Sequence, residues 1–325
     1  MKTVSIKFLN MWPGFKSEDN LINATLSMKY HVVIDEQNPD IIFCNNTPYA
    51  PDNGVTEPFR GKSKIVYWYS EALERMGDPN YDLCDFSITS CKYEHERNVR
   101  VPLWSLYIKW FECQKEYDPS RNQALLLPPK QLLKPKNKHS KTKFCCLLTN
   151  NDTAFKGIGY PRFLEFSHAH NLVTESRGNA FRNMPPIGDN GYDEKSKLEY
   201  IQDFKFNLCY DNSENRGWIT EKMIHPMSVG VIPIYWGAVD AAEEFNEEAF
   251  IHVRQFDNLD KLHEKVLEIH NNDDMFYSIQ TQPIFPNNTM PPCGTPEVII
   301  EGLQRIVEAL SLIHISEPTR LRRNS

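Results

Sequence analysis

Residues 204–237 constrain the fold of this chain more than any other part of its sequence. An apolar run is followed by a polar loop, a Thr-Glu-Lys triplet, a segment of helical character and a second apolar run. This order predicts a strand, a loop, a helix that begins at the triplet, and another strand. Backbone N–H groups and the helix dipole favour anions at such a helix start, and Lys222 adds a full positive charge. The segment therefore predicts a site for the diphosphate of a nucleotide sugar. Asn212, Glu221 and Trp218 could bind the hydroxyls and the ring of that sugar.

We call residues 204–237 the donor-site segment. Short apolar runs alternate with helical segments on both sides of it. In the first half of the chain they predict strands over residues 4–9, 31–34, 40–44, 64–69 and 82–89. Near-continuous apolar runs are typical of parallel strands that are covered on both faces. Ser17 is the predicted N-cap of a helix over residues 17–28. A second alternating series begins at Phe144 and ends with a predicted helix over residues 258–270. The pattern favours two α/β domains, which 325 residues suffice to build.

Residues 128–143 interrupt this alternation. They hold three prolines, six lysines and no acidic residue, a composition that stiffens and extends a chain. We interpret them as the linker between an N-terminal domain of residues 1–135 and a C-terminal domain of residues 144–310. The alternative is a long surface loop within a single domain.

The C-terminal end has two distinct parts. Residues 295–310 predict an amphipathic helix that packs on the core. Residues 311–325 share no pattern with what precedes them, and we interpret them as a non-native tail. The alternative is a short basic tail that touches anionic lipid, but its three arginines are too few for firm binding at ~1 kcal/mol each.

Composition excludes several classes of protein. A net charge of −7 gives no support to nucleic-acid binding, and no apolar run is long enough for a transmembrane helix. The first residues predict a strand rather than a signal peptide. The eight cysteines form no Cys-x-x-Cys pair, so neither a zinc site nor another metal site is expected. Free thiols indicate a reduced, cytoplasmic protein, for which peripheral contact with the inner face of a membrane remains open.

The donor-site segment resembles the motif of the α-1,3/4-fucosyltransferases, glycosyltransferase family 10, most closely in the bacterial branch. The matching residues are Phe206-Asn207-Leu208-Cys209, Asn212-Ser213, Thr220-Glu221-Lys222 and Ile232-Pro233-Ile234-Tyr235-Trp236-Gly237. The resemblance implies a GT-B type of α/β fold, in which two Rossmann-like domains face each other across a cleft. It also implies that the N-terminal domain binds the acceptor and the C-terminal domain binds GDP-fucose.

Charge on a leaving diphosphate must be neutralised, and this chain has no Asp-x-Asp motif to hold a metal ion for that purpose. The work is then expected to fall on cations and backbone amides, with no required cofactor and at most a non-essential stimulation by divalent cations. Lys222 is the first candidate. The resemblance implies Arg162 as the second, because a guanidinium can hold two phosphate oxygens at once. A solvated surface position is the alternative for each.

The resemblance assigns further donor contacts to the C-terminal domain. Glu221 and Asn212 are expected to bond hydroxyls of the ribose or the fucose, although an acid in a first helical turn and a turn-forming Asn are the alternatives. Trp218 stands where relatives usually have Tyr, so it can stack on a ring but lacks the hydroxyl. Tyr192 is expected to replace a donor-contacting tyrosine. Pro226 predicts a kink or an early end of the helix that follows Lys222.

The general base is expected in the N-terminal domain. In Tyr67-Trp68-Tyr69-Ser70-Glu71 a predicted strand ends in an acid, and the carboxyl ends of parallel strands face the ligand in α/β folds. Relatives have Gly-Glu here with the Glu as base, so the resemblance gives this role to Glu71. Glu74 is the rival, and a solvated loop glutamate is the alternative. Trp12 follows the first predicted strand, where it either stacks on the acceptor sugar or belongs to the core.

Together these expectations describe an inverting fucosyltransferase. Glu71 would deprotonate the 3-hydroxyl, or less favourably the 4-hydroxyl, of N-acetylglucosamine in a Galβ1-4GlcNAc-type oligosaccharide or lipopolysaccharide. The oxygen would then attack GDP-β-L-fucose. One alternative is a transferase of the same fold that uses another nucleotide sugar. A second is a glycan-binding protein without catalysis.

Overall fold

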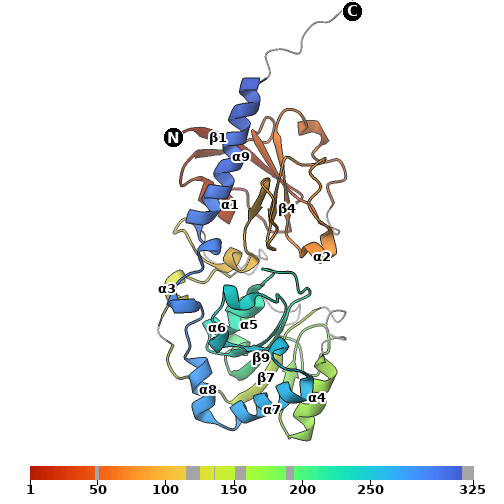
Figure 1. Ribbon diagram of the computed structural model, residues 1–325, viewed down its shortest axis with the longest axis vertical. Coiled ribbons are helices and arrows are strands. Elements are labelled where there is room, and N and C mark those ends of the chain that lie inside the picture. The colour runs from red at the N-terminus through yellow and green to blue at the C-terminus, as the bar shows by residue number, and fades with distance from the viewer. Residues whose placement is uncertain (48–50, 115–124, 135, 151–158, 188–193, 317–325) are drawn as a thin grey trace, which may run out of the picture. The chain divides into compact units, whose positions relative to one another are not determined.

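The computed structural model describes residues 1–47, 51–114, 125–134, 136–150, 159–187 and 194–316, with the side chains of 194 and 310–316 left aside. The chain forms two compact units, each built on a parallel sheet of its own (Figure 1). The first unit comprises Met1–Val101, Trp110–Lys115 and Pro292–Ser325, and the second comprises Pro102–Lys109 and Glu116–Pro291. The expectation of two parallel α/β units is confirmed.

The sheet of the first unit has the strand order β2-β1-β3-β4-β5-β6, and all its pairs are parallel. Its strands are β1 (Thr3–Leu9), β2 (His31–Ile34), β3 (Ile41–Asn45), β4 (Lys64–Tyr69), β5 (Phe86–Thr89) and β6 (Asn98–Arg100). Every residue of β3, β4 and β5 is buried, as the unbroken apolar runs predict. The carboxyl end of β4, where Glu71 follows, therefore lies in the middle of the sheet.

The described connections of the first unit contain only short helices. They contain α1 (Leu21–Leu26), η1 (Glu57–Phe59) and α2 (Leu73–Met76), and the unit ends with η8 (Pro292–Gly294) and α9 (Pro296–Ser316). Helix α1 starts later than predicted, because Asn20 and not Ser17 is its N-cap: the Asn20 side chain accepts from the amide of Asn23 at 2.9 Å. Both residue types cap well, so the sequence did not separate them.

Helix α9 belongs to the first unit, whereas its residues up to 310 were expected in the second domain. It packs on α1 (Figure 1) and on β6. Gly302 allows the close approach to β6, since a Cβ there would lie 2.5 Å from Cγ1 of Val99. Arg305 then donates to the carbonyls of Glu96 and Asn98, at 2.9 Å each. The helix continues to Ser316, so residues 311–316 prolong it, and the rest of the expected tail is outside the described residues.

The sheet of the second unit has the strand order β11-β10-β9-β7-β8 and is also parallel. Its strands are β7 (Lys143–Leu147), β8 (Thr174–Ser176), β9 (Phe204–Tyr210), β10 (Ile232–Trp236) and β11 (Ile251–His252). Its α-helices are α3 (Pro129–Leu132), α4 (Tyr160–Ala169), α5 (Glu194–Ile201), α6 (Glu221–Ser228), α7 (Leu259–His270) and α8 (Asp273–Gln280). Its short 3-10 helices are η2 (Leu103–Tyr107), η4 (Ala241–Glu243), η5 (Glu247–Ala249), η6 (Val253–Gln255) and η7 (Pro286–Asn288).

The strand–helix–strand order predicted for residues 204–237 is present as β9, α6 and β10. Of the two outcomes predicted at Pro226, the early end of the helix is not observed, because α6 runs through Pro226 and ends at Ser228. The kink stays a prediction. Proline removes one hydrogen bond, to the carbonyl four residues earlier, and in so short a helix that carbonyl belongs to Lys222 in the first turn. The loss is local and leaves the helix start in place.

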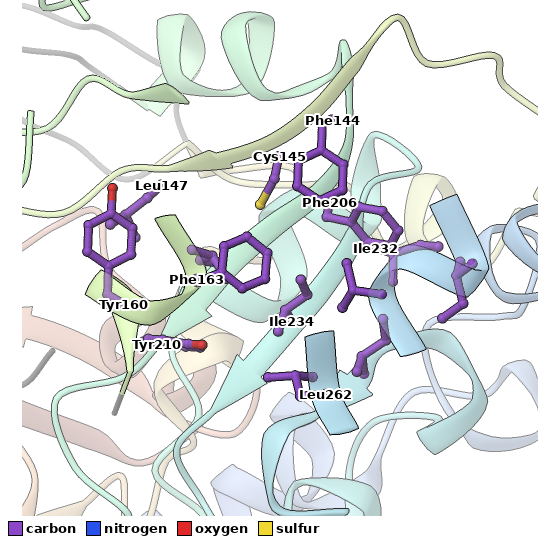
Figure 2. Close-up of a cluster of buried hydrophobic side chains, with 14 of the residues drawn as sticks. Phe144, Cys145, Leu147, Tyr160, Phe163, Phe206, Tyr210, Ile232, Ile234 and Leu262 are labelled. Carbon is purple, nitrogen blue, oxygen red and sulfur yellow. The ribbon is translucent and has the colours of Figure 1, made fainter. Parts of the chain in front are cut away.

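An apolar core between the sheet and helices α4 and α7 holds the second unit together. Figure 2 shows Phe144 and Phe206 from the sheet gathered with Phe163 of α4 and Leu262 of α7, and all four are at most 5% exposed. The rings of Phe144 and Phe163 stack with centroids 6.2 Å apart. This core fixes the positions of β9 and β10. It thereby fixes where the residues that follow their carboxyl ends lie.

Residues 128–143, interpreted above as a linker, belong to the second unit. This agrees with the alternative of a surface loop within one domain. Lys136 donates to the carbonyl of Met227 at 3.1 Å, and Lys141 donates to that of Val229 at 2.8 Å. Both cations therefore sit at the C-terminal end of α6, where the helix dipole favours positive charge. Burial lowers the pKa of Lys136, and that of Lys141, to about 8.

The eight cysteines are free thiols, six of them buried, with Cys293 half-buried and Cys113 exposed. Burial raises the pKa of Cys44 to about 12 and that of Cys91 to about 11, which removes the reactive thiolate. We expect Cys113 to react first and far faster than the buried thiols when the native protein meets a thiol reagent. Counting modified thiols by absorbance should give eight in denaturant, and a count of six or fewer there would contradict the free-thiol assignment.

Candidate functional site

The N-terminus of α6 is the centre of the candidate site. Strand β9 ends at Tyr210, and the loop that follows returns to α6 at Thr220. The Thr220 side chain caps the helix by accepting from the amide of Lys222 at 3.2 Å. Capping by Thr fixes where the helix begins and orients its first-turn amides, which is the arrangement that binds anions. The predicted helix start at the Thr-Glu-Lys triplet is confirmed.

Two acids and two lysines alternate in charge around this helix start. Lys222 Nζ lies 3.7 Å from Oδ1 of Asp211 and 3.9 Å from Oε1 of Glu221. Lys197 of α5 approaches the same Glu221 oxygen to 3.4 Å. Lys222 is the most solvent-accessible of the four, with 27% of its side chain exposed, against 17% for Glu221, 8% for Lys197 and none for Asp211. It is therefore the charge that an incoming anion can reach.

The two carboxylates of this group have opposite pKa shifts for a physical reason. Burial raises the pKa of Asp211 to about 6, although Lys222 and the hydroxyl of Thr220 act against it. Burial also acts to raise the pKa of Glu221, but Lys222 and Lys197 together outweigh it and hold that pKa below its ordinary value. Glu221 thus stays ionised and acts as a hydrogen-bond acceptor only. An ionised acceptor at this helix start suits hydroxyl groups of a ligand.

The loop between β9 and α6 is held by its own side chains. Trp218 is 2% exposed and its indole N–H donates to Oδ1 of Asn212 at 3.0 Å. The Gly217 amide donates to Asp240 at 2.7 Å, and Arg216 forms an ion pair with the same carboxylate at 3.3 Å. The predicted stacking of Trp218 on a sugar ring does not fit its burial. Its placement supports the orienting of Asn212 instead.

Arg162 has its described ion pair away from this group. Arg162 lies on α4 with 54% of its side chain exposed, and its Nη2 lies 2.6 Å from the carboxylate of Asp260 on α7. Tyr192 is outside the described residues. A phosphate role for Arg162 stays a prediction that would require exchange of Asp260 for the ligand.

Glu71 lies in the first unit, two residues after β4, and is half-buried, whereas Glu74 on α2 is exposed. The neighbouring Ser70 hydroxyl donates to the side chain of Asn45 at the end of β3, at 2.7 Å. Trp12, 38% exposed, packs edge-on against buried Trp68 with ring centroids 5.6 Å apart. The carboxyl ends of β1, β3 and β4 thus bring an acid and a partly exposed aromatic ring to one edge of this sheet.

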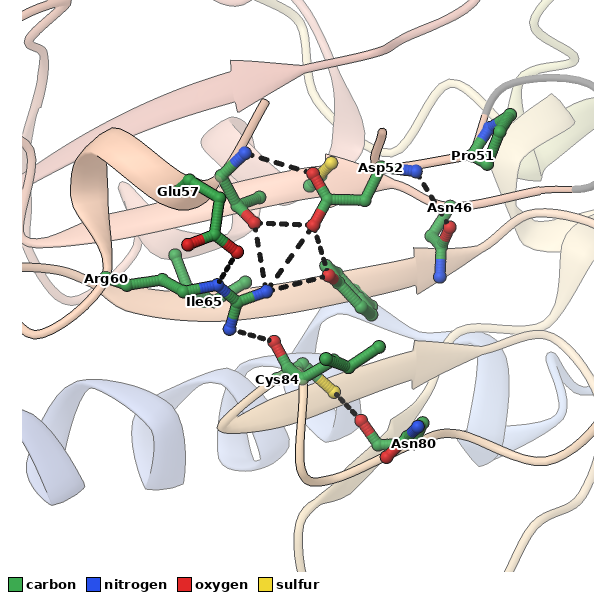
Figure 3. A network of polar contacts seen from close by, with 12 residues as sticks. Asn46, Pro51, Asp52, Glu57, Arg60, Ile65, Asn80 and Cys84 are labelled. Atoms are coloured by element: carbon green, nitrogen blue, oxygen red, sulfur yellow. Dashed lines mark hydrogen bonds and ion pairs between the residues drawn. The ribbon is translucent and has the colours of Figure 1, made fainter. Parts of the chain in front are cut away.

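A polar network fixes the chain beside that edge (Figure 3). Asp52 accepts from the hydroxyls of Thr56 and of Tyr67 on β4, and Arg60 forms an ion pair with it at 3.5 Å. Burial acts to raise the pKa of Asp52, but these hydroxyls and Arg60 outweigh it and lower that pKa. The Asp52 amide in turn donates to Asn46 at 3.2 Å. Segment 51–60 is therefore anchored to β4, the strand that precedes Glu71.

Sequence reasoning missed two members of the charged group, Asp211 and Lys197. Asp211 directly follows the β9 run and precedes Asn212 of the motif, a position that itself signals a strand end at the ligand edge. Lys197 had no comparable signal. A lysine on a polar helix normally stays in solvent, and only the packing of α5 beside α6 buries it.

Comparison with known proteins gives matches for both parts of the chain. Residues 139–280 match the family model described as Glycosyltransferase family 10 (fucosyltransferase) C-term. Residues 6–107 match the Alpha-(1,3)-fucosyltransferase FucT N-terminal domain. The chain is 26% identical over 286 residues to the Alpha-(1,3)-fucosyltransferase FucT of Helicobacter pylori, which covers 80% of this chain and 56% of that protein. The chain thus spans little more than half the length of this curated relative.

Solved structures show the same fold. A crystal structure of an alpha1,3-fucosyltransferase matches with a TM-score of 0.68 and 19% identity, over 94% of this chain and 90% of that one. The structure of an alpha1,3-fucosyltransferase with GDP-fucose matches with a TM-score of 0.63 and 19% identity, over 100% and 94%. The two parallel-sheet α/β domains expected of a GT-B type of fold are thereby confirmed. Since both models of one family match this chain, in its first and second halves, it belongs to glycosyltransferase family 10, the fucosyltransferase family.

Proposed function

We propose that this chain is an α-1,3-fucosyltransferase that transfers L-fucose from GDP-β-L-fucose with inversion. The acceptor is the 3-hydroxyl of N-acetylglucosamine in a Galβ1-4GlcNAc-type glycan, with the 4-hydroxyl as the less favoured position. The observation that carries the proposal is the capped start of α6, where Lys222 is the most exposed charge of a buried group in a fucosyltransferase-family chain. The solved structure of an alpha1,3-fucosyltransferase of similar fold with GDP-fucose supports the choice of donor.

The donor half of the reaction follows from the charges around α6. The diphosphate binds at the helix start, where first-turn amides and the Lys222 ammonium face it. Glu221 accepts hydrogen bonds from hydroxyls of the ribose or the fucose, and Asn212 contributes an amide. When the bond between the anomeric carbon and the diphosphate breaks, GDP takes the electron pair, and Lys222 stabilises the charge that develops on it.

The acceptor half assigns the general base to Glu71. Its carboxylate takes the proton of the acceptor hydroxyl while that oxygen forms a bond to the anomeric carbon from the face opposite GDP. Attack on the β-linked donor from that side gives an α-linked product. Because a base must come within hydrogen-bond distance of its proton, the reaction requires the acceptor hydroxyl to reach Glu71 and the anomeric carbon together.

No metal ion is required in this proposal. The described residues contain no group of three or more His, Cys, Asp or Glu side chains arranged to hold one, and charge neutralisation is assigned to Lys222 and backbone amides. A divalent cation would at most stimulate turnover.

Among the residues that the structure describes, no helix is both long and apolar enough to cross a membrane. We propose a cytoplasmic enzyme whose acceptor is an oligosaccharide or a lipopolysaccharide, the latter met at the membrane surface.

A transfer assay in EDTA tests the donor and the metal independence together. The protein is given N-acetyllactosamine and, separately, GDP-fucose, GDP-mannose or a UDP-sugar, and products are identified by mass spectrometry and NMR. We expect transfer from GDP-fucose alone, unchanged by EDTA to within about twofold, and an α1,3 linkage. Transfer from another donor instead would move the assignment to a different nucleotide sugar. Nucleotide binding without transfer to any glycan would favour a non-catalytic role.

A further inference from the structure

Asp211 has no role in the reaction as described so far, yet its carboxylate has three side-chain partners at the start of α6. It is fully buried at the end of β9. Its Oδ1 accepts from the Thr220 hydroxyl at 2.6 Å, and its Oδ2 accepts from the Tyr235 hydroxyl at 3.0 Å. Lys222 Nζ lies 3.7 Å from Oδ1. We propose that Asp211 is a positioning residue, which fixes the Lys222 ammonium and the first turn of α6 for the donor diphosphate.

The carboxylate holds α6 in two ways. It orients the helix cap through Thr220. The Thr220 hydroxyl donates a hydrogen bond to Asp211, and its oxygen accepts one from the Lys222 amide. Through its charge the carboxylate holds the Lys222 side chain, whose four-carbon stem is otherwise flexible. Tyr235 extends the link to β10, because its oxygen also accepts from the amide of Ala238 at 2.9 Å. One buried group thus ties β9, α6 and the end of β10 together.

A purely structural role would not call for a charge at this position. Burying a carboxylate is costly unless it is paired, and an amide or apolar side chain would fill the same space with less desolvation. Lys222 is the cation that compensates Asp211, and it also has the exposed face that a phosphate can reach. The inference rests on the proposed use of Lys222 at the diphosphate. Lys222 then binds the diphosphate only when Asp211 next to it is ionised.

Simple Coulomb repulsion makes the opposite prediction. Removing a negative charge close to a diphosphate site should strengthen anion binding if Lys222 were already well placed. Positioning predicts weaker binding, because the freed ammonium must be ordered again when the ligand arrives. The sign of the change in GDP affinity therefore separates the two accounts.

The test is a double-mutant cycle between Asp211→Asn and Lys222→Ala, read by calorimetric GDP binding at neutral pH. We expect Asp211→Asn to weaken GDP binding by about 10- to 100-fold, the effect of losing a charged hydrogen-bond partner. In the Lys222→Ala background the same change should have little further effect. Asp211→Glu, which keeps the carboxylate, should recover part of the affinity. Unchanged or tighter GDP binding in Asp211→Asn, or additive losses, would overturn the proposal.

Glu175 on β8 provides a matched control. It is also a buried carboxylate of the second unit, with a tyrosine donor, Tyr200 at 2.9 Å, and a lysine partner, Lys143 at 3.1 Å. Within the described part of the chain, the contacts of Glu175 are with Lys143, Arg177 and Tyr200 and not with Lys222, so Glu175→Gln should change GDP affinity equally in both Lys222 backgrounds. Coupling of Glu175 to Lys222 as strong as that of Asp211 would count against a specific role for Asp211.

A second readout needs no ligand at all. Acylation of Lys222 by an amine-reactive ester, followed by mass spectrometry, should be several-fold faster in Asp211→Asn than in the wild type and unchanged in Glu175→Gln. If Asp211→Asn does not fold, Tyr235→Phe removes one hydrogen bond to the carboxylate and should raise the same labelling rate. Faster labelling in a protein that binds no GDP would reject the proposed donor while supporting the inference. Unchanged labelling would reject the inference, whichever nucleotide sugar is used.

Discussion

Replacing Glu71 with glutamine is expected to lower the rate of fucose transfer by about 100- to 10,000-fold, the usual contribution of a general base. Glutamine has nearly the same shape as glutamate but cannot take the acceptor proton. Because Glu71 follows β4 in the first unit, and the α6 site lies in the second, GDP affinity should stay within about twofold of the wild type. Steady-state kinetics with N-acetyllactosamine, together with calorimetric GDP binding, measure both quantities.

Glu74 supplies the control for this prediction. It is the nearby rival, three residues on and exposed on α2, and Glu74→Gln should leave turnover within about twofold of the wild type. Near-native turnover in Glu71→Gln together with loss in Glu74→Gln would transfer the base to Glu74. Near-native turnover in both variants would remove the base from this edge of the sheet.

Replacing Lys222 with alanine is expected to lower the turnover number by about 100- to 1,000-fold, or about 2.7–4 kcal/mol, the loss typical of removing one donor to developing charge. The ammonium lies at the start of α6, where charge grows on departing GDP. GDP affinity should fall as well, because the same cation contacts the bound diphosphate. Saturating kinetics separate the loss in turnover from the loss in affinity.

Lys261 is a suitable comparison for Lys222. It also lies in the first turn of a helix of the second unit, α7, behind an Asn258 cap, and it pairs with Glu264 at 2.7 Å. A first-turn lysine without a ligand should matter little, so Lys261→Ala is expected to change turnover by less than about twofold. Equal losses in both variants would point to general destabilisation rather than to the donor. Native turnover in Lys222→Ala would refute the phosphate assignment.

Local signals in the sequence were enough for most of the donor site. The apolar runs that became β9 and β10 report burial on both faces, and Thr220 has the side chain that a helix cap needs. The same reasoning placed β2 and β4 at their observed bounds and put Glu71 after a central strand. These features depend on a few consecutive residues, which is why a single chain read in order reveals them.

Other features depend on which elements pack together, and these the sequence left open. Trp218 was expected to face a sugar, yet the fold buries it and turns its N–H to Asn212. Arg162 is expected at the phosphates, a role that stays a prediction, and the fold places Asp260 of α7 beside it. Helix α9 was expected with the second domain, whereas a close fit at Gly302 joins it to the first unit. Each outcome is decided by a partner distant in sequence.

The sequence by itself determined the two α/β units, the helix start at Thr220 and the positions of Lys222, Glu221 and Glu71 in those units. Tertiary structure alone decided that Asp211 is buried beside Lys222 and Lys197 beside Glu221. The physical reason is that strand periodicity and helix caps are local, whereas the ionisation and orientation of a charged side chain depend on burial and on charges that other elements supply.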